Sequence, residues 1–332
     1  MLLPRAPAAA DRPAQYVAIA FDNCTELERW QEWSDFAAAL ERDGIVARFT
    51  FFVSGINFIA DARKDIYQPP REPRGRSRIN FGGTPRDVAS RIGYINGLRR
   101  KGHEIASHAV GHFDGRHWSA ADWQKEFDSF DTAFAHIAAV NDLAAGAGFD
   151  FPVREIAGFR APYLATSPGL YEVMSRGRFR YHANGGKEPD AWPVKEGGLW
   201  AFSLANIRLA GGRRRTLSMD YNFLVAQSLG LDDARNRDRH RQQMLESYLD
   251  YFRANYAGNR APIHIGHHFS DYQGGAYREA LKDFVRSVCG LPEVRCTTYA
   301  RLADFLDALD PQTLAAYRAG GFARAEAPAL AA

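Results

Sequence analysis

Residues 16–23 have the sequence YVAIAFDN, in which six largely apolar residues run directly into Asp22 and Asn23. An apolar run of this length is typical of a buried strand, and the two polar residues then lie where the strand ends. Residues 27–40 follow with apolar side chains at helical spacing, and Gly44 comes after their end. This part of the chain therefore predicts a strand followed by a helix.

The same order of strand and helix recurs along the chain. Short apolar runs predict further strands at residues 49–53, 104–107, 156–160, 179–183, 199–204, 216–219, 262–266 and 294–297. Helical spacing and capping residues predict helices that begin at Thr84 and Ser119, and others at residues 168–176, 238–255, 277–289 and 298–309. Repeated strand–helix units favour an α/β fold with a mainly parallel sheet, open or closed into a barrel.

No change in composition divides the chain into separate domains. Residues 57–83 are rich in Pro, Gly and Arg and predict a long loop. We expect a flexible N-terminal segment at residues 1–14, a single domain at residues 15–312, and an Ala/Arg-rich tail at residues 313–332.

The composition excludes several classes of protein. The 332 residues include 42 Lys and Arg against 39 Asp and Glu, and a net charge of +3 is too small to indicate a nucleic-acid partner. The Arg-rich stretches at residues 71–78 and 213–215 are expected to be solvated loops. No apolar run approaches the roughly eighteen residues that span a bilayer, and residues 1–14 lack the pattern of an intact signal peptide.

Two of the three cysteines lie close together in the sequence. Cys289 and Cys296 flank a Gly-Leu-Pro turn, and two cysteines at this spacing can close a small disulfide loop. The alternative is a pair of buried thiols at the end of a helix and the start of a strand. A disulfide would favour an oxidising compartment.

Polar side chains gather where the predicted strands end. They follow four strands that are far apart in the sequence: Asp22 and Asn23, His108 and His112, Arg160, and His267 and His268. Because the carboxyl ends of parallel strands share one rim, these side chains are expected to converge there.

Each of these clusters has a functional and a structural interpretation. His108 and His112 are four positions apart, so both imidazoles could reach one metal ion, although such pairs also occur by chance. Asp22 could be a general base, a metal ligand or a helix cap. Arg160, just before a proline, could orient a carboxylate or lie on the surface.

Three histidines crowd the strand end near residue 266. Strand alternation places His264 and His268 on one side of the strand and His267 on the other. A single histidine here would more often be structural, but three within five residues favour a functional site.

Together these segments resemble the polysaccharide deacetylase family, carbohydrate esterase family 4, also called the NodB homology domain. The resemblance covers residues 16–306 in the family's order. Its motifs correspond here to Phe21-Asp22-Asn23, Phe49-Thr50-Phe51-Phe52-Val53, Gly102-His103-Glu104-Ile105 leading into Ser107-His108 and His112, Arg160-Ala161-Pro162-Tyr163, and Ile265-Gly266-His267. The resemblance implies a distorted (β/α) barrel.

The resemblance also implies a metal site and a general base. Asn23, His108 and His112 would correspond to the ligands of a divalent metal, most often zinc in such sites. Asp22 would be the general base that takes a proton from the attacking water.

The other catalytic roles follow from the same resemblance. The metal and the backbone N–H of Tyr163 would stabilise the oxyanion. Arg160 would orient Asp22, and His267 would protonate the departing amine.

The chain departs from the family's pattern in two places. Asn23 occupies the position of a metal-binding aspartate, and a neutral carboxamide should bind the metal more weakly. The family's fourth motif, an Asp/Trp element that tunes the catalytic histidine, corresponds either to Asp220 or to Asp190 with Trp192. A strand before Asp220 favours Asp220, and Trp192 would then line a sugar platform or lie in the core.

The resemblance implies hydrolysis of acetyl groups on an acetylated glycan, most readily N-acetyl groups of a peptidoglycan, chitin-like polymer or exopolysaccharide. A related hydrolase of a small linear or cyclic amide is a second hypothesis. A non-catalytic glycan-binding protein with a decayed metal site is a third. The glycan class and the cysteine pair predict a periplasmic or secreted location, and the oligomeric state stays open.

Overall fold

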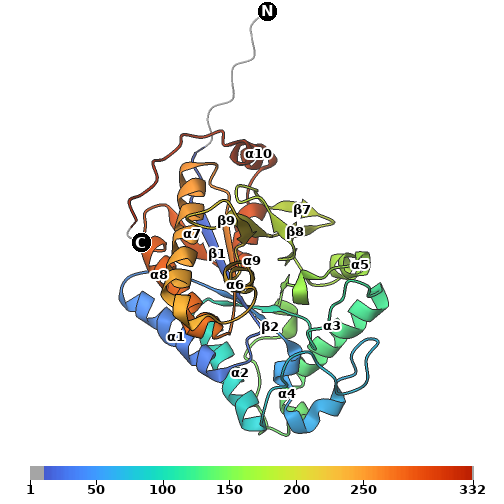
Figure 1. Ribbon diagram of the computed structural model, residues 1–332. Helices are drawn as coiled ribbons and strands as arrows, with labels where there is room; N and C mark the ends of the chain where they lie inside the picture. Colours follow the sequence, from blue (N-terminus) through green and yellow to red (C-terminus); the bar gives the residue numbers. More distant parts are fainter. Residues whose placement is uncertain (1–10, 331–332) are drawn as a thin grey trace, which may run out of the picture.

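The computed structural model describes residues 11–330, and most strands in this part of the chain join one curled sheet (Figure 1). Its order is β11-β1-β2-β3-β4-β5-β8-β7, with β12 also paired to β1. The bounds are β1 (Gln15–Asp22), β2 (Thr50–Val53), β3 (Glu104–Ser107), β4 (Gly158–Phe159), β5 (Tyr181–His182), β7 (Val194–Glu196), β8 (Leu199–Ala201), β11 (Ile263–His268) and β12 (Val294–Thr297). Every pair except β7–β8 is parallel. The expected α/β fold is confirmed.

A second, smaller sheet makes the barrel irregular. It has the order β10-β9-β6, with β6 (Gly186–Lys187), β9 (Leu204–Arg208) and β10 (Arg215–Leu217). A parallel bridge between Met219 and Gly266 joins its end to β11. The small sheet therefore continues around the barrel beside β11, which gives the distorted barrel that was expected.

The sequence of β1 explains how the strand is buried on both faces. Ala18 and Ala20 face the barrel interior, where small side chains leave room for the large rings of Phe52, Tyr181 and Tyr299. The alternate residues of β1 point outward into the larger core beneath the helices. Asp22 is the last residue of β1, and it lies on the same inner face of the strand as Ala18 and Ala20.

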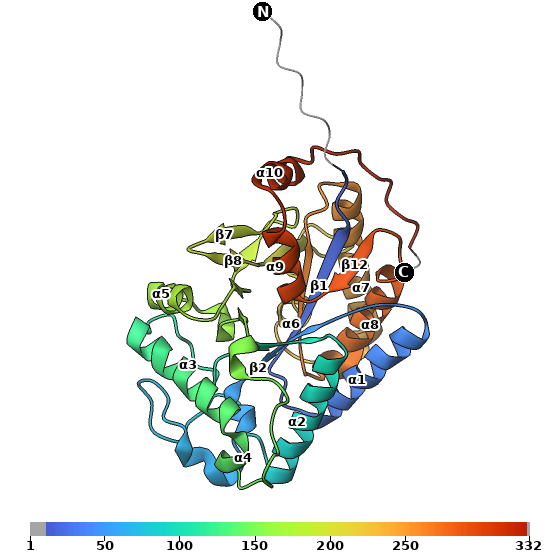
Figure 2. The same ribbon diagram turned by 180° about the vertical axis from the view of Figure 1, so that it is seen from behind.

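Helices pack around the curled sheet, and most of them cover its outer side (Figures 1 and 2). They are α1 (Leu27–Arg42), α2 (Pro85–Arg100), α3 (Ala120–Ala135), α4 (Ile137–Val140), α5 (Pro168–Arg176), α6 (Asp220–Ser228), α7 (Arg237–Ala257), α8 (Ala276–Val288), α9 (Tyr299–Asp307) and α10 (Pro311–Ala319). Helix α9 instead packs Tyr299, Leu302 and Leu306 against the residues of the barrel interior. The expected caps are present, because Thr84 with Asp87 and Ser119 with Asp122 form capping boxes. No helix among residues 11–330 is long and apolar enough to cross a membrane.

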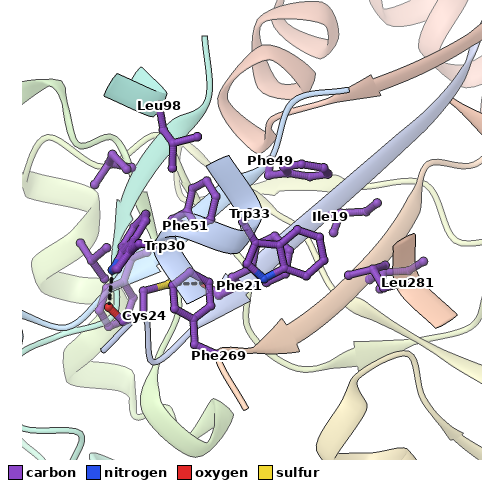
Figure 3. Packing of buried hydrophobic residues seen from close by; sticks show 14 of the residues in the cluster. Ile19, Phe21, Cys24, Trp30, Trp33, Phe49, Phe51, Leu98, Phe269 and Leu281 are labelled. Atoms are coloured by element: carbon purple, nitrogen blue, oxygen red, sulfur yellow. Dashed lines mark hydrogen bonds between the residues drawn. The ribbon is translucent and has the colours of Figure 1, made fainter. Parts of the chain in front are cut away.

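Aromatic rings fill the core between β1, β2 and α1 (Figure 3). Phe21 lies 4.4 Å from the ring of Trp33, and Trp30 lies 5.0 Å from Phe51. Phe269, just after β11, packs edge-on against Trp30 at 5.1 Å. This cluster fixes the positions of the strand ends β1 and β11, where the polar residues lie.

The helices α6 and α10 and the short strands β6 and β7 were not expected from the sequence. Helix α6 begins at Asp220, directly after the segment 216–219 that was expected to be a strand. Residues 313–319, the start of the expected tail, belong to α10, whose cap residue Asp310 accepts hydrogen bonds from Gln312 and Thr313. Of the expected N-terminal segment, residues 1–10 lie outside the described residues.

The expected disulfide is confirmed. Cys289 and Cys296 are bonded, with a Cα–Cα distance of 5.5 Å, and the bond links the end of α8 to β12. Cys24 is a free, buried thiol in the outer core.

We expect the double variant Cys289→Ala, Cys296→Ala to lower the free energy of unfolding by about 2–3 kcal/mol, because the bond closes a short loop in the unfolded chain. Urea denaturation of the oxidised protein and the variant measures this change. Reduced wild-type protein should unfold at the variant's midpoint, and equal midpoints for all three samples would contradict the prediction.

Candidate active site

Asp22 and Arg160 form a buried ion pair at the carboxyl end of the barrel. Arg160 Nη1 lies 2.8 Å from Asp22 Oδ1, and the two side chains are 0% and 3% exposed. Burial raises the pKa of Asp22, but the charge of Arg160 and its hydrogen bond lower the pKa by more, with a smaller contribution from His268, and the net pKa lies below the usual value. Asp22 is therefore ionised at neutral pH and held in one orientation.

The barrel interior holds Arg160 itself in place. Its Nε donates to the carbonyl oxygen of Ala183 at 3.0 Å, and its guanidinium lies 4.4 Å from the centre of the Phe52 ring. Nη2 lies 3.4 Å from the Tyr299 hydroxyl. These contacts give Arg160 the geometry that the expected orienting role requires.

His108 and His112 come together on the turn that follows β3. Their ring centres are 5.1 Å apart. His108 Nδ1 donates to the carbonyl oxygen of Arg160 at 2.8 Å, which leaves Nε2 as the free nitrogen of that ring. Burial lowers the pKa of both histidines, that of His112 to about 3, so both are neutral at pH 7, the form that binds metal ions.

A divalent metal at this turn would need a third ligand besides the two histidines. Asn23 Oδ1 and His112 Nδ1 are buried and have no hydrogen-bond partner among the described residues. In that part of the chain no cluster of three or more His, Cys, Asp and Glu side chains has the geometry of a metal site. A metal bound here would therefore have two imidazole nitrogens and the amide oxygen of Asn23 as ligands, and these three groups carry no charge.

His267 does not lie at the rim beside Asp22, where the family's pattern predicts the catalytic histidine. Its side chain points to the outer face of β11, where Nε2 lies 3.1 Å from the Tyr248 hydroxyl, and burial lowers its pKa to about 4. His268 of β11 lies opposite Asp22 of β1, so its side chain is on the same inner face of the sheet. The negative charge of Asp22 also acts on His268. His268, and not His267, therefore lies with Asp22 at the rim.

Asp220 fixes the orientation of His268. The Asp220 carboxylate accepts from His268 Nδ1 at 2.6 Å, from the His268 backbone N–H at 2.8 Å and from the Ser270 hydroxyl at 3.3 Å. Burial lowers the pKa of His268, but the charge and hydrogen bond of Asp220 raise it more, and the net pKa lies above 6.5. The Nε2 atom of His268 is left free to hold a proton toward the site.

The other candidate for the fourth motif lies elsewhere. Trp192 is 7% exposed, stacks on Tyr317 of α10 at 5.5 Å and donates to the carbonyl oxygen of Asn259. Asp190 is in the same region, where its carbonyl oxygen accepts from Asn259. Trp192 is therefore a core residue and not a sugar platform, and Asp220 is the carboxylate that contacts the histidines.

Tyr163 lies at the opening of the site. Its backbone has a φ of 56°, its side chain is 60% exposed, and its ring lies 4.7 Å from that of His112. A hollow of about 500 Å³ begins at Tyr163 and is lined also by Pro70, Arg71, Glu72, Arg78, Phe113, Asp114, Arg116, His117 and Trp118. The stretch of residues 71–78, expected to be only a solvated loop, thus forms one wall beside the site.

The sequence indicated that His267 and His268 lie on opposite faces of one strand, but the comparison with the family's motif selected His267. Alternation along a strand places His268 on the face opposite to His267. Asp22 ends β1 facing inward, and its parallel partner in the neighbouring strand faces the same way. The register between the two strand ends, which the structure supplies, then places His268 on the face of Asp22.

Comparisons with known proteins point to one fold. No protein-family model matches the chain, and no curated protein matches it in sequence. Among solved structures, the chain is similar to a putative polysaccharide deacetylase from Mycobacterium smegmatis, with 16% identity, a TM-score of 0.53, and coverage of 93% of this chain and 96% of that chain. The chain therefore has the polysaccharide deacetylase fold, as expected.

Two other solved structures resemble the chain more distantly. One is the carbohydrate esterase family 4 domain of a multidomain xylanase from the hindgut metagenome of Trinervitermes trinervoides, with 15% identity, a TM-score of 0.47 and coverage of 90% of each chain or more. The other is a family 4 acetyl xylan esterase from Clostridium thermocellum in complex with a cobalt ion, with 15% identity, a TM-score of 0.47, and coverage of 90% of this chain and 95% of that chain.

Proposed function

We propose that this chain, which has the polysaccharide deacetylase fold, belongs to that family and hydrolyses acetyl groups on a glycan with the help of a divalent metal. N-acetyl groups of N-acetylglucosamine units are the proposed target, and zinc is the proposed metal. The observation that carries the proposal is the convergence of a buried Asp22–Arg160 pair, the His108–His112 turn and an Asp220–His268 pair on one rim.

Asn23, His108 and His112 would hold the metal. A divalent cation held there would supply Lewis-acid chemistry for the acetyl carbonyl. Asn23 Oδ1 and His112 Nδ1 need a partner, and His108 is fixed by its bond to the Arg160 carbonyl with Nε2 free. The chain's own residues then provide the proton transfers.

Asp22 acts as general base in this proposal. Its carboxylate takes the proton of the attacking water, and Arg160 keeps it ionised and oriented toward the rim. The backbone N–H of Tyr163 is assigned to the oxyanion by the family's pattern. His268, with its proton on Nε2, donates that proton to the departing amine, and Asp220 stabilises the positive charge on the ring.

The general base Asp22 and the general acid His268 together predict a bell-shaped pH dependence of kcat/KM for acetate release. The base Asp22 must be ionised, and because Arg160 lowers its pKa, its protonation reduces activity only at a pH below the usual range of an aspartate. The acid His268 must be protonated, and because its pKa is raised, activity declines as the pH rises through a value above 6.5. A pH–rate profile of the zinc-loaded protein measures both limbs. A basic limb that persists unchanged in His268→Gln would contradict this assignment.

The hollow beside Tyr163 supports a glycan as the substrate. Of the aromatic residues in its lining, Tyr163 offers exposed ring surface, whereas Phe113 and Trp118 are buried, and the three arginines of the lining offer hydrogen-bond donors. An exposed aromatic ring and charged hydrogen-bond donors together suit the apolar faces and hydroxyl edges of sugar rings. We propose that the glycan chain extends from the acetylated unit into this hollow. Such a substrate and the Cys289–Cys296 bond are in keeping with a periplasmic or secreted location.

Hydrolysis of a panel of substrates tests the proposal, measured as acetate release for the acetylated substrates and as ring opening for the cyclic imide. The panel contains oligomers of N-acetylglucosamine, peptidoglycan fragments, acetylated xylan and a small cyclic imide, each assayed with added zinc. Acetate release that rises with oligomer length supports a glycan deacetylase. Turnover of the cyclic imide alone would support the small-amide hydrolase, and binding of oligomers without any acetate would support the glycan-binding protein.

We expect Asn23→Asp to tighten zinc binding by about tenfold or more, which corresponds to about 1.4 kcal/mol. The change adds one negative charge to a donor set that is otherwise neutral. Competition with a fluorescent chelator measures the dissociation constant of both proteins. Asn23→Ala serves as the control that should weaken binding, and equal affinity of all three proteins would remove Asn23 from the ligand set.

A further inference from the structure

The turn between His108 and His112 adopts an unusual backbone conformation. Ala109 has a φ of 59° and His112 a φ of 56°, values that non-glycine residues rarely adopt. Such conformations cost about 1–3 kcal/mol each and persist only where the surroundings enforce them. The contacts that enforce this turn therefore determine how the two imidazoles face each other.

One contact comes from Glu126, a fully buried residue of α3. Its Oε1 accepts from the backbone N–H of Val110 at 2.9 Å and from that of Gly111 at 3.1 Å. Without this carboxylate, both N–H groups would lose their acceptor in a buried place, which costs about 1–3 kcal/mol for each group. Glu126 thus binds the middle of the turn, between His108 and His112.

A second contact comes from Tyr67, in the long segment 57–83. Its hydroxyl donates to Glu126 Oε2 at 2.7 Å. Its ring also covers Gly111, where an added Cβ would lie only 2.7 Å from Tyr67 Cε1. The same segment reaches the turn again at Arg78, whose backbone N–H donates to the Gly111 carbonyl at 2.9 Å.

We infer that Glu126 and Tyr67 are positioning residues of the proposed metal site: they hold the His108–His112 turn in the conformation that binds the metal. The inference rests on the proposed function, because it takes the two histidines as ligands. Neither residue touches the site directly. The long segment that walls the hollow thereby also sets the geometry of the ligands.

Zinc affinity and amide exchange of four variants test the inference. Glu126→Ala is expected to weaken zinc binding by about 10–100-fold, the usual effect of losing a residue that supports a ligand. Glu126→Gln keeps a carbonyl oxygen for both backbone N–H groups and is expected to stay within about threefold of the wild type. Tyr67→Phe, which removes only one hydrogen bond, should fall between these two. The readouts are competition with a fluorescent chelator and hydrogen exchange of residues 108–113 in metal-free protein.

Glu104→Ala is the matched control. Glu104 also accepts three hydrogen bonds, from the Thr50 hydroxyl at 2.9 Å, the Tyr181 hydroxyl at 2.7 Å and the Ala300 N–H at 2.9 Å, but it lies at the opposite end of β3. Its loss is expected to lower stability without changing exchange in the His108–His112 turn or zinc affinity.

The outcomes separate this inference from the proposed function. Wild-type affinity and wild-type amide exchange in Glu126→Ala would overturn the inference and leave the metal site standing. A wild-type protein that binds no zinc would overturn the metal site and, with it, the assignment of Glu126. If Glu126→Ala does not fold, the comparison of Glu126→Gln with Tyr67→Phe decides, and equal exchange and affinity in both would overturn the inference.

Discussion

Replacing His268 by glutamine is expected to lower kcat for acetate release by about 10²–10⁴-fold, the usual contribution of a positioned general acid. Glutamine keeps a donor toward Asp220 but has no titratable proton for the departing amine. Because the change affects the chemical step, KM should stay close to the wild-type value. Steady-state kinetics on the best substrate of the panel measures both parameters.

His267→Gln is the matched control for this prediction. His267 neighbours the same Asp220, at 3.9 Å, but its ring lies on the outer face of β11 against Tyr248. The variant should lose some stability because a buried hydrogen bond to Tyr248 changes, and its kcat should stay within about tenfold of the wild type. A large loss of kcat in His267→Gln with near-normal activity in His268→Gln would reverse the assignment.

Asp22→Asn is expected to lower kcat/KM by about 10²–10⁴-fold, because the amide cannot take a proton from the attacking water. The variant also leaves the buried guanidinium of Arg160 without its counter-charge, which should lower the free energy of unfolding by about 3–5 kcal/mol. Acetate release and urea denaturation of the same sample measure the two effects.

Arg160→Met separates the two contributions of the pair. It leaves the Asp22 carboxylate in place but removes the charge that lowers its pKa, so the acid limb of the pH–rate profile should move to higher pH. Asp22→Asn has no base left to titrate, and its residual activity should lack that limb. Unchanged activity in Asp22→Asn would remove Asp22 from the mechanism.

The fold was predictable because its signals are local. In β1, the small inward-facing residues Ala18 and Ala20 alternate with larger outward-facing residues, and this alternation is visible in the sequence YVAIAFDN. The capping boxes at Thr84 and Ser119 are also local patterns. Helices α6 and α10 were missed because a short, partly polar helix at the end of a strand or in an Ala-rich tail has little periodic signal.

The site was predictable only in part, because it depends on tertiary contacts. Asp22, Arg160, His108 and His112 are brought together as their strand-end positions indicate. The choice between His267 and His268 depends on which face of β11 meets the barrel interior, and the motif alone pointed to the wrong residue. Glu126 of α3 supports the turn at Val110 and is itself bound by Tyr67, which lies 59 residues earlier in the chain. No pattern in the sequence indicates these contacts.

We propose that a metal held by Asn23, His108 and His112 enables acetate release. The most direct test is a zinc titration of chelator-treated protein, with acetate release from an N-acetylated glycan as the readout. We expect no activity in the metal-free protein and full activity at one zinc per chain. Undiminished acetate release from metal-free protein would contradict it.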